Sequence, residues 1–169
     1  MIRPIKHRRR PLDGILLFDK PKGVTSNYIL QKIKCLYQAE KAGHTGTLDP
    51  MATGLLPIAF GEATKFTQHL LEAYKSYQFT CQLGVKTSTG DKEGRIIKIN
   101  SIPLFNDALL LSTFKNFLGV TKQIPPMVSA LKHQGRKLYE LEREGIEVER
   151  KPRSITIKKL TLNHFTSSS

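Results

Sequence analysis

Apolar and polar positions in the first 75 residues predict two strands and two helices. Residues 15–18 form a short apolar run that favours a buried strand ending at the turn sequence KPKG. Ser26 is then a candidate N-cap for a helix with one apolar face, formed by Ile29, Leu30, Ile33, Leu36 and Tyr37. The run LLPIAF predicts a second strand, and GEATKFTQHLLEAY after it has the pattern of a helix.

Period-two alternation marks the next part of the chain. In SYQFTCQLGV one face carries Tyr77, Phe79, Cys81, Leu83 and Val85, which predicts a half-exposed strand. The segment GDKEG, residues 90–94, predicts a turn into RIIKI and so a hairpin. Asn106 is a candidate cap for a helix that stops at Gly119, and residues 154–162 predict a further strand.

Length and composition favour one folded domain, or part of one. The chain has 169 residues, of which 39% are hydrophobic and 24% charged, as in soluble globular proteins. No stretch reaches eighteen apolar residues, so no membrane span is expected. The chain stops soon after the strand at 154–162 without an element to cover it. An unpaired strand at that place favours a truncated domain or a partner.

Charge points to a polyanionic partner. Lys and Arg number 27 against 14 Asp and Glu, a formal net charge of +13. Residues 3–10 predict a basic arm that touches phosphate, although a functionless tail fits equally well. Residues 121–139 combine several cations with amides, His133 and Tyr139 and contain no acidic residue. This mixture suits RNA, and the alternative is a solvated loop.

Cofactor motifs are missing from the sequence. Cys35 and Cys81 lie far apart without clustered histidines, which predicts no metal site and a reducing, cytosolic setting. There is no phosphate-binding loop and no dinucleotide fingerprint. Lys65, in GEATK, is either a solvated helix residue or a phosphate contact. Any chemistry is therefore expected to run without a metal or a dinucleotide.

The stretch GHTGTLDPMATG, residues 43–54, is the strongest candidate for a chemical site. It holds three glycines, three threonines, His44 and Asp49 within twelve residues. Pro50 biases Asp49 toward an extended or turn backbone, and the glycines let another backbone approach closely. A carboxylate on such a loop can be a nucleophile, a general base or only a turn former.

Four colinear segments resemble one family. GHTGTLDPMATGLLPIAFGEATKF closely resembles the catalytic loop of the TruB family of tRNA pseudouridine synthases, and DGILLFDKPKGVTSN resembles its first motif. KSYQF is similar to the strand that carries its active-site tyrosine, and QIPPMVSALKHQGRKLYELEREGIEV to its tRNA-contacting insertion. The resemblance covers residues 12–162 in order.

The resemblance implies an α+β fold, the pseudouridine synthase catalytic fold, with a mixed, mostly antiparallel sheet flanked by helices. Residues 1–11 would form a basic arm, and residues 12–169 the N-terminal part of the catalytic domain. The second half of that domain, with an arginine that pairs with the aspartate, and the small C-terminal PUA domain have no counterpart in the sequence. We therefore expect a truncated catalytic domain.

The implied activity is isomerisation of the T-loop uridine (position 55) of tRNA to pseudouridine, without cofactor or metal. By resemblance, Asp49 is the catalytic residue, as nucleophile or as base. Tyr77 stacks on the extruded uracil, and His44 enters the RNA loop to fill the space left by the base. The remaining predicted contacts are Lys20 and Pro21, which pack beside the tyrosine, and Lys65, Lys132 and Arg136, which hold phosphate.

Two other functions fit the same residues. One is an RNA-guided pseudouridine synthase of the dyskerin class, and the other is a tRNA-binding module without catalysis. Within the tRNA synthase reading, the truncation leaves open that this chain is an inactive fragment. The resemblance further implies a monomeric cytoplasmic protein whose partner is the T-stem-loop of tRNA, with neither DNA nor a membrane as partner.

Overall fold

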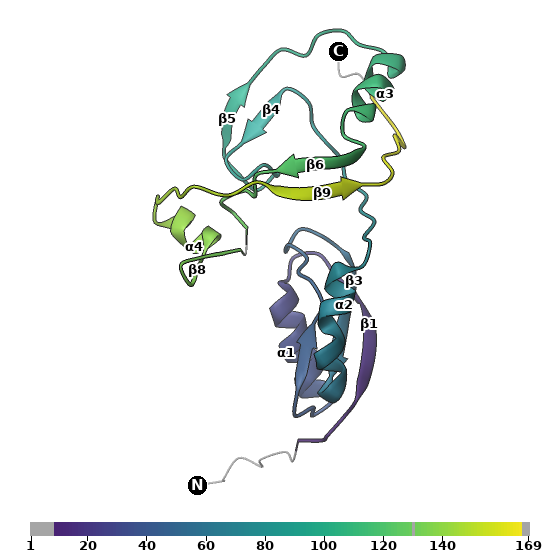
Figure 1. Ribbon diagram of the computed structural model, residues 1–169, viewed down its shortest axis with the longest axis vertical. Coiled ribbons are helices and arrows are strands. Elements are labelled where there is room, and N and C mark those ends of the chain that lie inside the picture. The colour runs from purple at the N-terminus through teal and green to yellow at the C-terminus, as the bar shows by residue number, and fades with distance from the viewer. Residues whose placement is uncertain (1–8, 130, 167–169) are drawn as a thin grey trace. The chain divides into compact units, whose positions relative to one another are not determined.

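A computed structural model describes residues 9–129 and 131–166 of the chain (Figure 1). The chain divides into two compact units, Met1–Gln78 and Phe79–Ser169, which are described separately. Both combine helices with small antiparallel sheets, so the α+β class is confirmed. No helix in the described part is long and apolar enough to cross a membrane.

A three-stranded antiparallel sheet forms the centre of the first unit. It contains β1 (Gly14–Lys20), β2 (Ala42–His44) and β3 (Gly54–Phe60), in the order β1-β3-β2. The register of β1 and β3 runs from Gly14 opposite Phe60 to Lys20 opposite Gly54. The strands expected from the runs at 15–18 and LLPIAF are both present, which confirms these two predictions.

The expectation that residues 15–18 form a buried strand is wrong for one face of β1. Leu16 and Phe18 pack against the core, whereas Ile15 and Leu17 point to the other side, and Leu17 is 68% exposed. Successive side chains of a strand face opposite sides of a sheet. The core residues that β1 joins lie on one side only, so an apolar run here does not mean burial on both faces.

Helix α1 (Ser26–Leu36) supplies the other half of the core. Ile29, Leu30 and Ile33 are buried together with the β3 residues Leu56, Ile58 and Phe60. The predicted apolar face included one residue too many, because Leu36 is 77% exposed. The helix ends at Leu36, and Tyr37 follows as its C-cap. The Tyr37 ring still lies 5.4 Å from that of Phe60.

The helix begins differently from the prediction. Thr25, and not Ser26, is the N-cap, since its extended backbone precedes the helix and its hydroxyl accepts from the Tyr28 amide at 3.1 Å. Ser26 is the first helical residue, and it is buried. Two hydroxyl residues in a row make the cap ambiguous in sequence, and the helix start decides between them.

The segment that follows β3 was expected to be one helix and is divided in two. A 3-10 helix, η1 (Gly61–Phe66), is followed by the α-helix α2 (Thr67–Glu72). The Asp13 carboxylate accepts from the Glu62 amide at 2.7 Å, within the first turn of η1. Hydrogen bonds of this kind satisfy amides that a helix start leaves without a partner.

The strand predicted over SYQFTCQLGV is largely wrong. Only Val85, its last residue, lies in a strand, and Tyr77 and Phe79 are exposed. An alternating segment becomes a strand only when another strand offers it hydrogen bonds. Within residues 9–129 and 131–166 no strand pairs with residues 77–83.

The second unit begins with the predicted hairpin. Strand β4 (Val85–Thr87) pairs antiparallel with β5 (Ile96–Ile99), and residues 90–94 lie in the connection as expected. Helix α3 (Asp107–Lys115) follows, and it ends before the expected stop at Gly119. Its N-cap is Asn106, whose side chain accepts from the Leu109 amide at 2.9 Å, which confirms the predicted cap.

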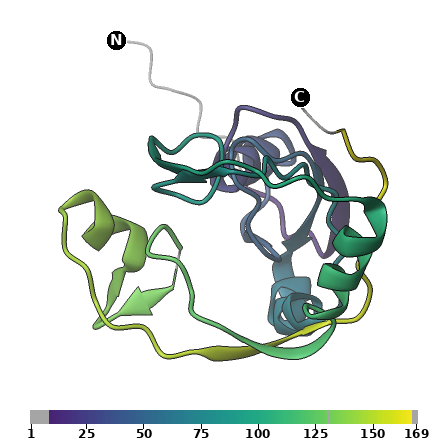
Figure 2. The same ribbon diagram turned by 90° about the horizontal axis from the view of Figure 1, so that it is seen from above.

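The rest of this unit is built on a two-stranded ribbon, seen in Figure 1 and again in Figure 2, of β6 (Gly119–Gln123) and β9 (Arg153–Ile157). The short strands β7 (Lys132–His133) and β8 (Arg136–Lys137) lead into α4 (Leu138–Arg143). The strand expected at 154–162 therefore ends at Ile157. The expectation that it is unpaired is wrong, because β9 pairs with β6.

Candidate functional site

The loop between β2 and β3 carries Asp49 in a tight turn. The Asp49 carbonyl accepts from the Ala52 amide at 3.0 Å, so residues 49–52 form the turn. Asp at the first position and Pro at the second are the residues that such turns favour. The Asp49 side chain belongs to an exposed residue. The structure thus places the candidate carboxylate where a bound molecule can reach it.

Both neighbours of Asp49 are held by residues that follow β1, namely Ser26 at the start of α1 and Gly23 in the turn before it. The Ser26 hydroxyl accepts from the Leu48 amide at 2.9 Å and donates to the Leu48 carbonyl at 3.0 Å. On the other side, the Gly23 amide donates to the Pro50 carbonyl at 2.7 Å. The first motif and the aspartate loop, which the sequence treats as separate segments, are therefore joined by three hydrogen bonds.

Lys20 lies at the end of β1 and is fully buried. Its ammonium donates to the carbonyls of Pro21, at 3.0 Å, and Val24, at 2.8 Å. None of the ion pairs between described residues includes it. In this arrangement Lys20 shapes the turn that carries Gly23, and its ammonium is turned toward the backbone and away from solvent. Pro21, predicted beside it as a substrate contact, is exposed.

His44 is the last residue of β2 and pairs with Ile58 of β3. Its Nδ1 atom is buried and has no hydrogen-bond partner among the described residues. Directly after it, Thr45 is buried and its amide donates to the Pro57 carbonyl at 3.0 Å. His44 therefore sits at the start of the anchored loop that carries Asp49 at its middle.

Tyr77 lies outside any helix or strand and is 72% exposed. It belongs to the first unit, as does Asp49. The strand that was expected to carry Tyr77 on its apolar face does not form at this residue. Its stacking on a uracil stays a prediction.

The cations predicted to hold phosphate are exposed and differ in their partners. Lys65 forms an ion pair with Glu62, and this hydrogen bond and charge raise the pKa of the Lys65 ammonium. Arg136 on β8 pairs with Glu144. Lys132 on β7 takes part in none of the ion pairs between described residues. Of the three, Lys132 is the most available to an added anion.

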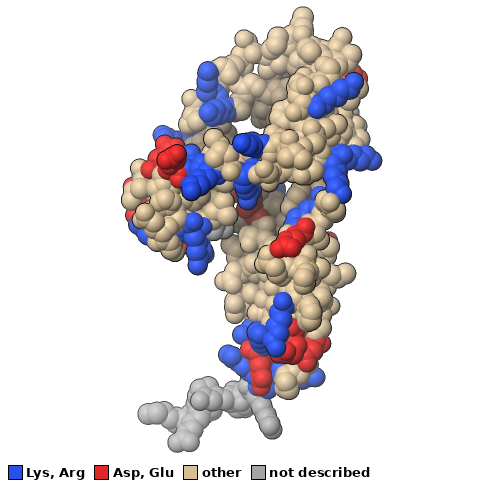
Figure 3. Space-filling view, in the orientation of Figure 1, with Lys and Arg blue, Asp and Glu red and all other residues tan. Residues whose placement is uncertain are grey.

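Lys and Arg side chains are spread over both units on the face that Figure 3 shows. At the end of β8, Lys137 donates to the Tyr139 hydroxyl at 3.2 Å, and this contact raises the pKa of its ammonium. The Lys137 and Arg143 cations both lie 5.3 Å from the Tyr139 ring centre. Tyr139 is therefore already engaged by cations, which limits its use as a free stacking platform.

Residues 1–8, most of the predicted arm, lie outside the described residues. Arg10 is bonded through its backbone to Gln38 and Glu40.

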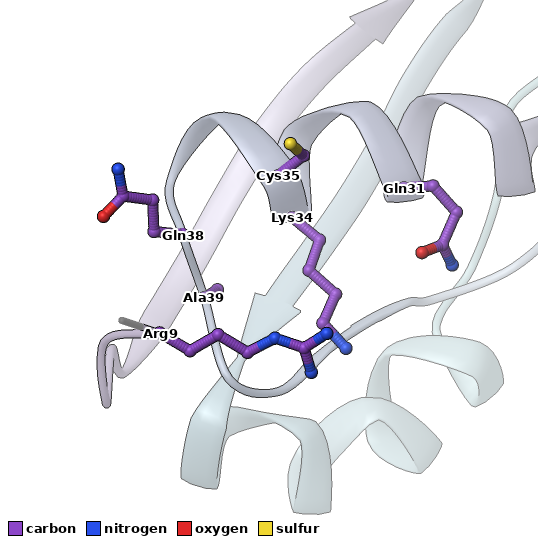
Figure 4. Close-up of a pocket in the computed structure, with 6 residues that line it drawn as sticks. All are labelled: Arg9, Gln31, Lys34, Cys35, Gln38 and Ala39. Carbon is purple, nitrogen blue, oxygen red and sulfur yellow. The ribbon is translucent and has the colours of Figure 1, made fainter. Parts of the chain in front are cut away.

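Two pockets lie away from these residues. One, of about 350 Å³, is lined by residues of α1 and its flanks, namely Arg9, Gln31, Lys34, Cys35, Gln38 and Ala39 (Figure 4). The other is lined by residues 124, 147–150 and 152. Neither is lined by one of the predicted site residues, and Asp49 itself is an exposed loop residue.

Among the described residues, no group of three or more His, Cys, Asp or Glu side chains is placed so that it could bind a metal ion. Cys35 and Cys81 are free thiols.

Sequence reasoning missed Ser26 and Gly23 as partners of the aspartate loop. Ser26 was predicted only as a helix cap, and no local pattern signals a bond to a residue 22 positions away.

Comparison with known proteins supports the resemblance found in the sequence. The model of the TruB family pseudouridylate synthase N-terminal domain matches residues 34–169. A protein of Coxiella burnetii named tRNA pseudouridine synthase B is 56% identical over 161 residues, which are 95% of this chain and 52% of that protein. A protein of the same name from Tolumonas auensis is 54% identical, over 98% of this chain and 51% of its own length.

Among solved structures, the crystal structure of a Cbf5-Nop10-Gar1 complex contains a chain that is 26% identical, with a TM-score of 0.51. The match covers 91% of this chain and 36% of that one. The chain spans about half the length of the curated relatives it matches. Since the family model covers most of the sequence, the chain belongs to the TruB family of pseudouridylate synthases.

Proposed function

We propose that this chain carries the N-terminal part of the catalytic machinery of a tRNA pseudouridine synthase that isomerises the T-loop uridine at position 55. The observation that supports the proposal most directly is the placement of Asp49. Asp49 is an exposed residue at the start of a turn, and its two neighbours, Leu48 and Pro50, are hydrogen-bonded to the first motif. The function of relatives named tRNA pseudouridine synthase B agrees with that placement.

The reaction breaks the bond between ribose C1′ and uracil N1, turns the base over, and joins C1′ to C5. The C5 proton is lost and N1 gains a proton, so no electrons and no co-reactant are consumed. Asp49 would act either as a nucleophile at C1′, as carboxylates do in glycosidases, or as a base. Both routes need an accessible carboxyl group, and Asp49, in the turn at residues 49–52, is an exposed residue.

A base must leave the RNA stack to reach Asp49. Unstacking costs a few kcal/mol, whereas stacking on an aromatic ring returns roughly 1 to 3 kcal/mol. We propose Tyr77 as that ring, since its side chain is largely exposed. His44, at the start of the loop that carries Asp49, would occupy the space left by the base. Phosphate contacts by Lys65, Lys132 and Arg136 would then hold the RNA.

The proposed partner is the T-stem-loop of tRNA, and the proposed state is a cytoplasmic monomer. The free thiols of Cys35 and Cys81 are consistent with a reducing compartment. The excess of 27 Lys and Arg over 14 Asp and Glu favours a polyanion.

The test is tritium release from a T-stem-loop RNA labelled at uridine C5, without a guide RNA. Asp49→Asn should abolish release and leave RNA affinity within about twofold, because it removes the reacting group only. Asp107→Asn is the matched control, since Asp107 is an exposed aspartate in the first turn of α3. Release that persists in Asp49→Asn would refute the assigned role.

The same assay separates the alternatives. Release from the bare RNA argues against a guide-dependent enzyme. Binding without release, with an affinity that falls steeply with salt, would instead identify an RNA-binding module.

A further inference from the structure

Ser26 uses its hydroxyl in an uncommon way for the first residue of a helix. It both accepts from the Leu48 amide and donates to the Leu48 carbonyl, at 2.9 and 3.0 Å. Serine side chains in helices usually bond to their own helix or face solvent. Ser26 is only 1% exposed, and Thr25 already caps the helix. The helix therefore does not require the Ser26 hydroxyl.

These two bonds determine the backbone before Asp49. The Leu48 carbonyl belongs to the peptide group that leads into Asp49, and the Ser26 hydroxyl holds it. The peptide group that leaves Asp49 is held by the Ala52 amide within the turn. With the peptide groups on both sides held, the direction of the Asp49 Cα–Cβ bond is set, and with it the place from which the carboxylate projects. Only the first of them depends on a side chain from another element.

The surroundings make this contact rigid. Ser26 belongs to the helix whose Ile29, Leu30 and Ile33 form the core, and the Leu48 side chain packs against the same core. A hydroxyl mounted on a packed helix holds its partner more firmly than one on a free loop. Loss of the hydroxyl would leave the Leu48 amide and carbonyl without the partner that they have here.

We propose that Ser26 is a positioning residue for Asp49, acting through the backbone of Leu48. This inference rests on the proposed function, in which Asp49 reacts with the nucleotide. Its effect falls on the reaction step and not on RNA binding, because the predicted phosphate contacts lie on other segments. A displacement of about 1 Å at a reacting group can cost about a hundredfold in rate.

The test compares two adjacent hydroxyls. Ser26→Ala removes the bonds to Leu48, and Thr25→Ala removes the helix cap and leaves those bonds in place. Tritium release at saturating and limiting T-stem-loop gives kcat and KM. We expect Ser26→Ala to lower kcat by about 10- to 100-fold with KM within about threefold. Thr25→Ala should keep both constants within about twofold.

Amide hydrogen exchange supplies a readout that needs no activity. Ser26→Ala should accelerate exchange of the Leu48 amide at least tenfold and leave Tyr28 nearly unchanged. Thr25→Ala should do the reverse, because the Tyr28 amide loses its acceptor. The chemical shift of the Asp49 carboxyl carbon should move in Ser26→Ala only.

Equal kcat values for the two variants would overturn the proposal. It would also be overturned if the hydrogen-exchange rate of the Leu48 amide were the same in Ser26→Ala as in the parent. If the unmodified chain releases no tritium, the proposed activity of this chain fails. The positioning role is then decided by the Leu48 exchange rate and the Asp49 carboxyl shift. Both must respond to Ser26→Ala and not to Thr25→Ala for it to stand.

Discussion

Asp13 and Glu62, 49 positions apart in the sequence, are joined by a 2.7 Å hydrogen bond from the Glu62 amide to the Asp13 carboxylate. Gly61 lies beside this bond with φ of +52°, and its amide donates to the Lys41 carbonyl at 3.0 Å. A Cβ atom at Gly61 would lie 2.2 Å from the Asp13 oxygen and 2.4 Å from the Leu12 carbonyl. The contact between the start of β1 and the start of η1 therefore requires glycine at this position.

Gly61→Ala should lower the free energy of unfolding by about 2–5 kcal/mol, because overpacking adds about 1–3 kcal/mol to the backbone strain. Gly23→Ala is the control, with φ of +89° and open space around its Cβ position. It should cost about 1–2 kcal/mol from strain alone. Urea unfolding followed by circular dichroism measures both, and equal losses would contradict a steric clash between the added methyl group and Asp13.

Lys20→Met should lower the free energy of unfolding by about 1–3 kcal/mol. Methionine fills the buried space but leaves the carbonyls of Pro21 and Val24 without their donor. Lys22→Met, in the same turn but exposed, should change stability by less than about 0.5 kcal/mol. Urea unfolding of both variants decides it, and a Lys20→Met protein as stable as the parent would show that the ammonium contributes nothing net.

Lys132→Ala should weaken binding of a T-stem-loop RNA and reduce the slope of log affinity against log salt by about 1. Lys65→Ala should reduce it less, because Lys65 already pairs with Glu62. Fluorescence anisotropy at several salt concentrations measures both slopes. Identical slopes for Lys132→Ala and the parent would remove Lys132 from the RNA contacts.

The β4–β5 connection should lose stability in acid. The pKa of the Asp91 carboxyl is lowered. The chief cause is the Thr89 hydroxyl, which lies 2.6 Å from the carboxylate, and the amides of Glu93 and Gly94 add to the effect. A lowered folded pKa contributes stability above the ordinary value of 3.8, and that contribution is lost as the pH falls below it.

Amide exchange of Glu93 should therefore accelerate as the pH is lowered from about 5 to 3, after correction for the intrinsic rate. Thr89→Val, which removes the principal cause of the shift, should flatten this dependence. A Glu93 amide with the same pH dependence in the parent and in Thr89→Val would argue against the hydroxyl as that cause.

Elements with a strong local signal were predictable from sequence. The apolar run of β3, the turn within the β4–β5 hairpin and the Asn106 cap each depend on residues close in the chain. The strand expected around Tyr77 was not formed, because alternation specifies the faces of a strand but not its hydrogen-bonding partner. The start of α1 was predicted to within a residue, and one residue sufficed to exchange the roles of Thr25 and Ser26.

The candidate site was predictable in its residues but not in its supports. Asp49 stands out through its loop composition and the following proline. Lys20 was expected at the substrate, whereas its ammonium is buried against backbone carbonyls. Buried lysines are rare, so a charged residue in the middle of a motif gives no sign of such a position.

The order of strands in the first sheet has a consequence for synthesis. β3 is the last of the three strands in the chain but lies between the other two. While the ribosome is still translating residues 45–53, β1 and β2 have no strand to pair with, so the sheet can form only after Phe60 has emerged. The aspartate turn leads directly into β3. A nascent chain therefore acquires its aspartate loop and its first stable core in the same step.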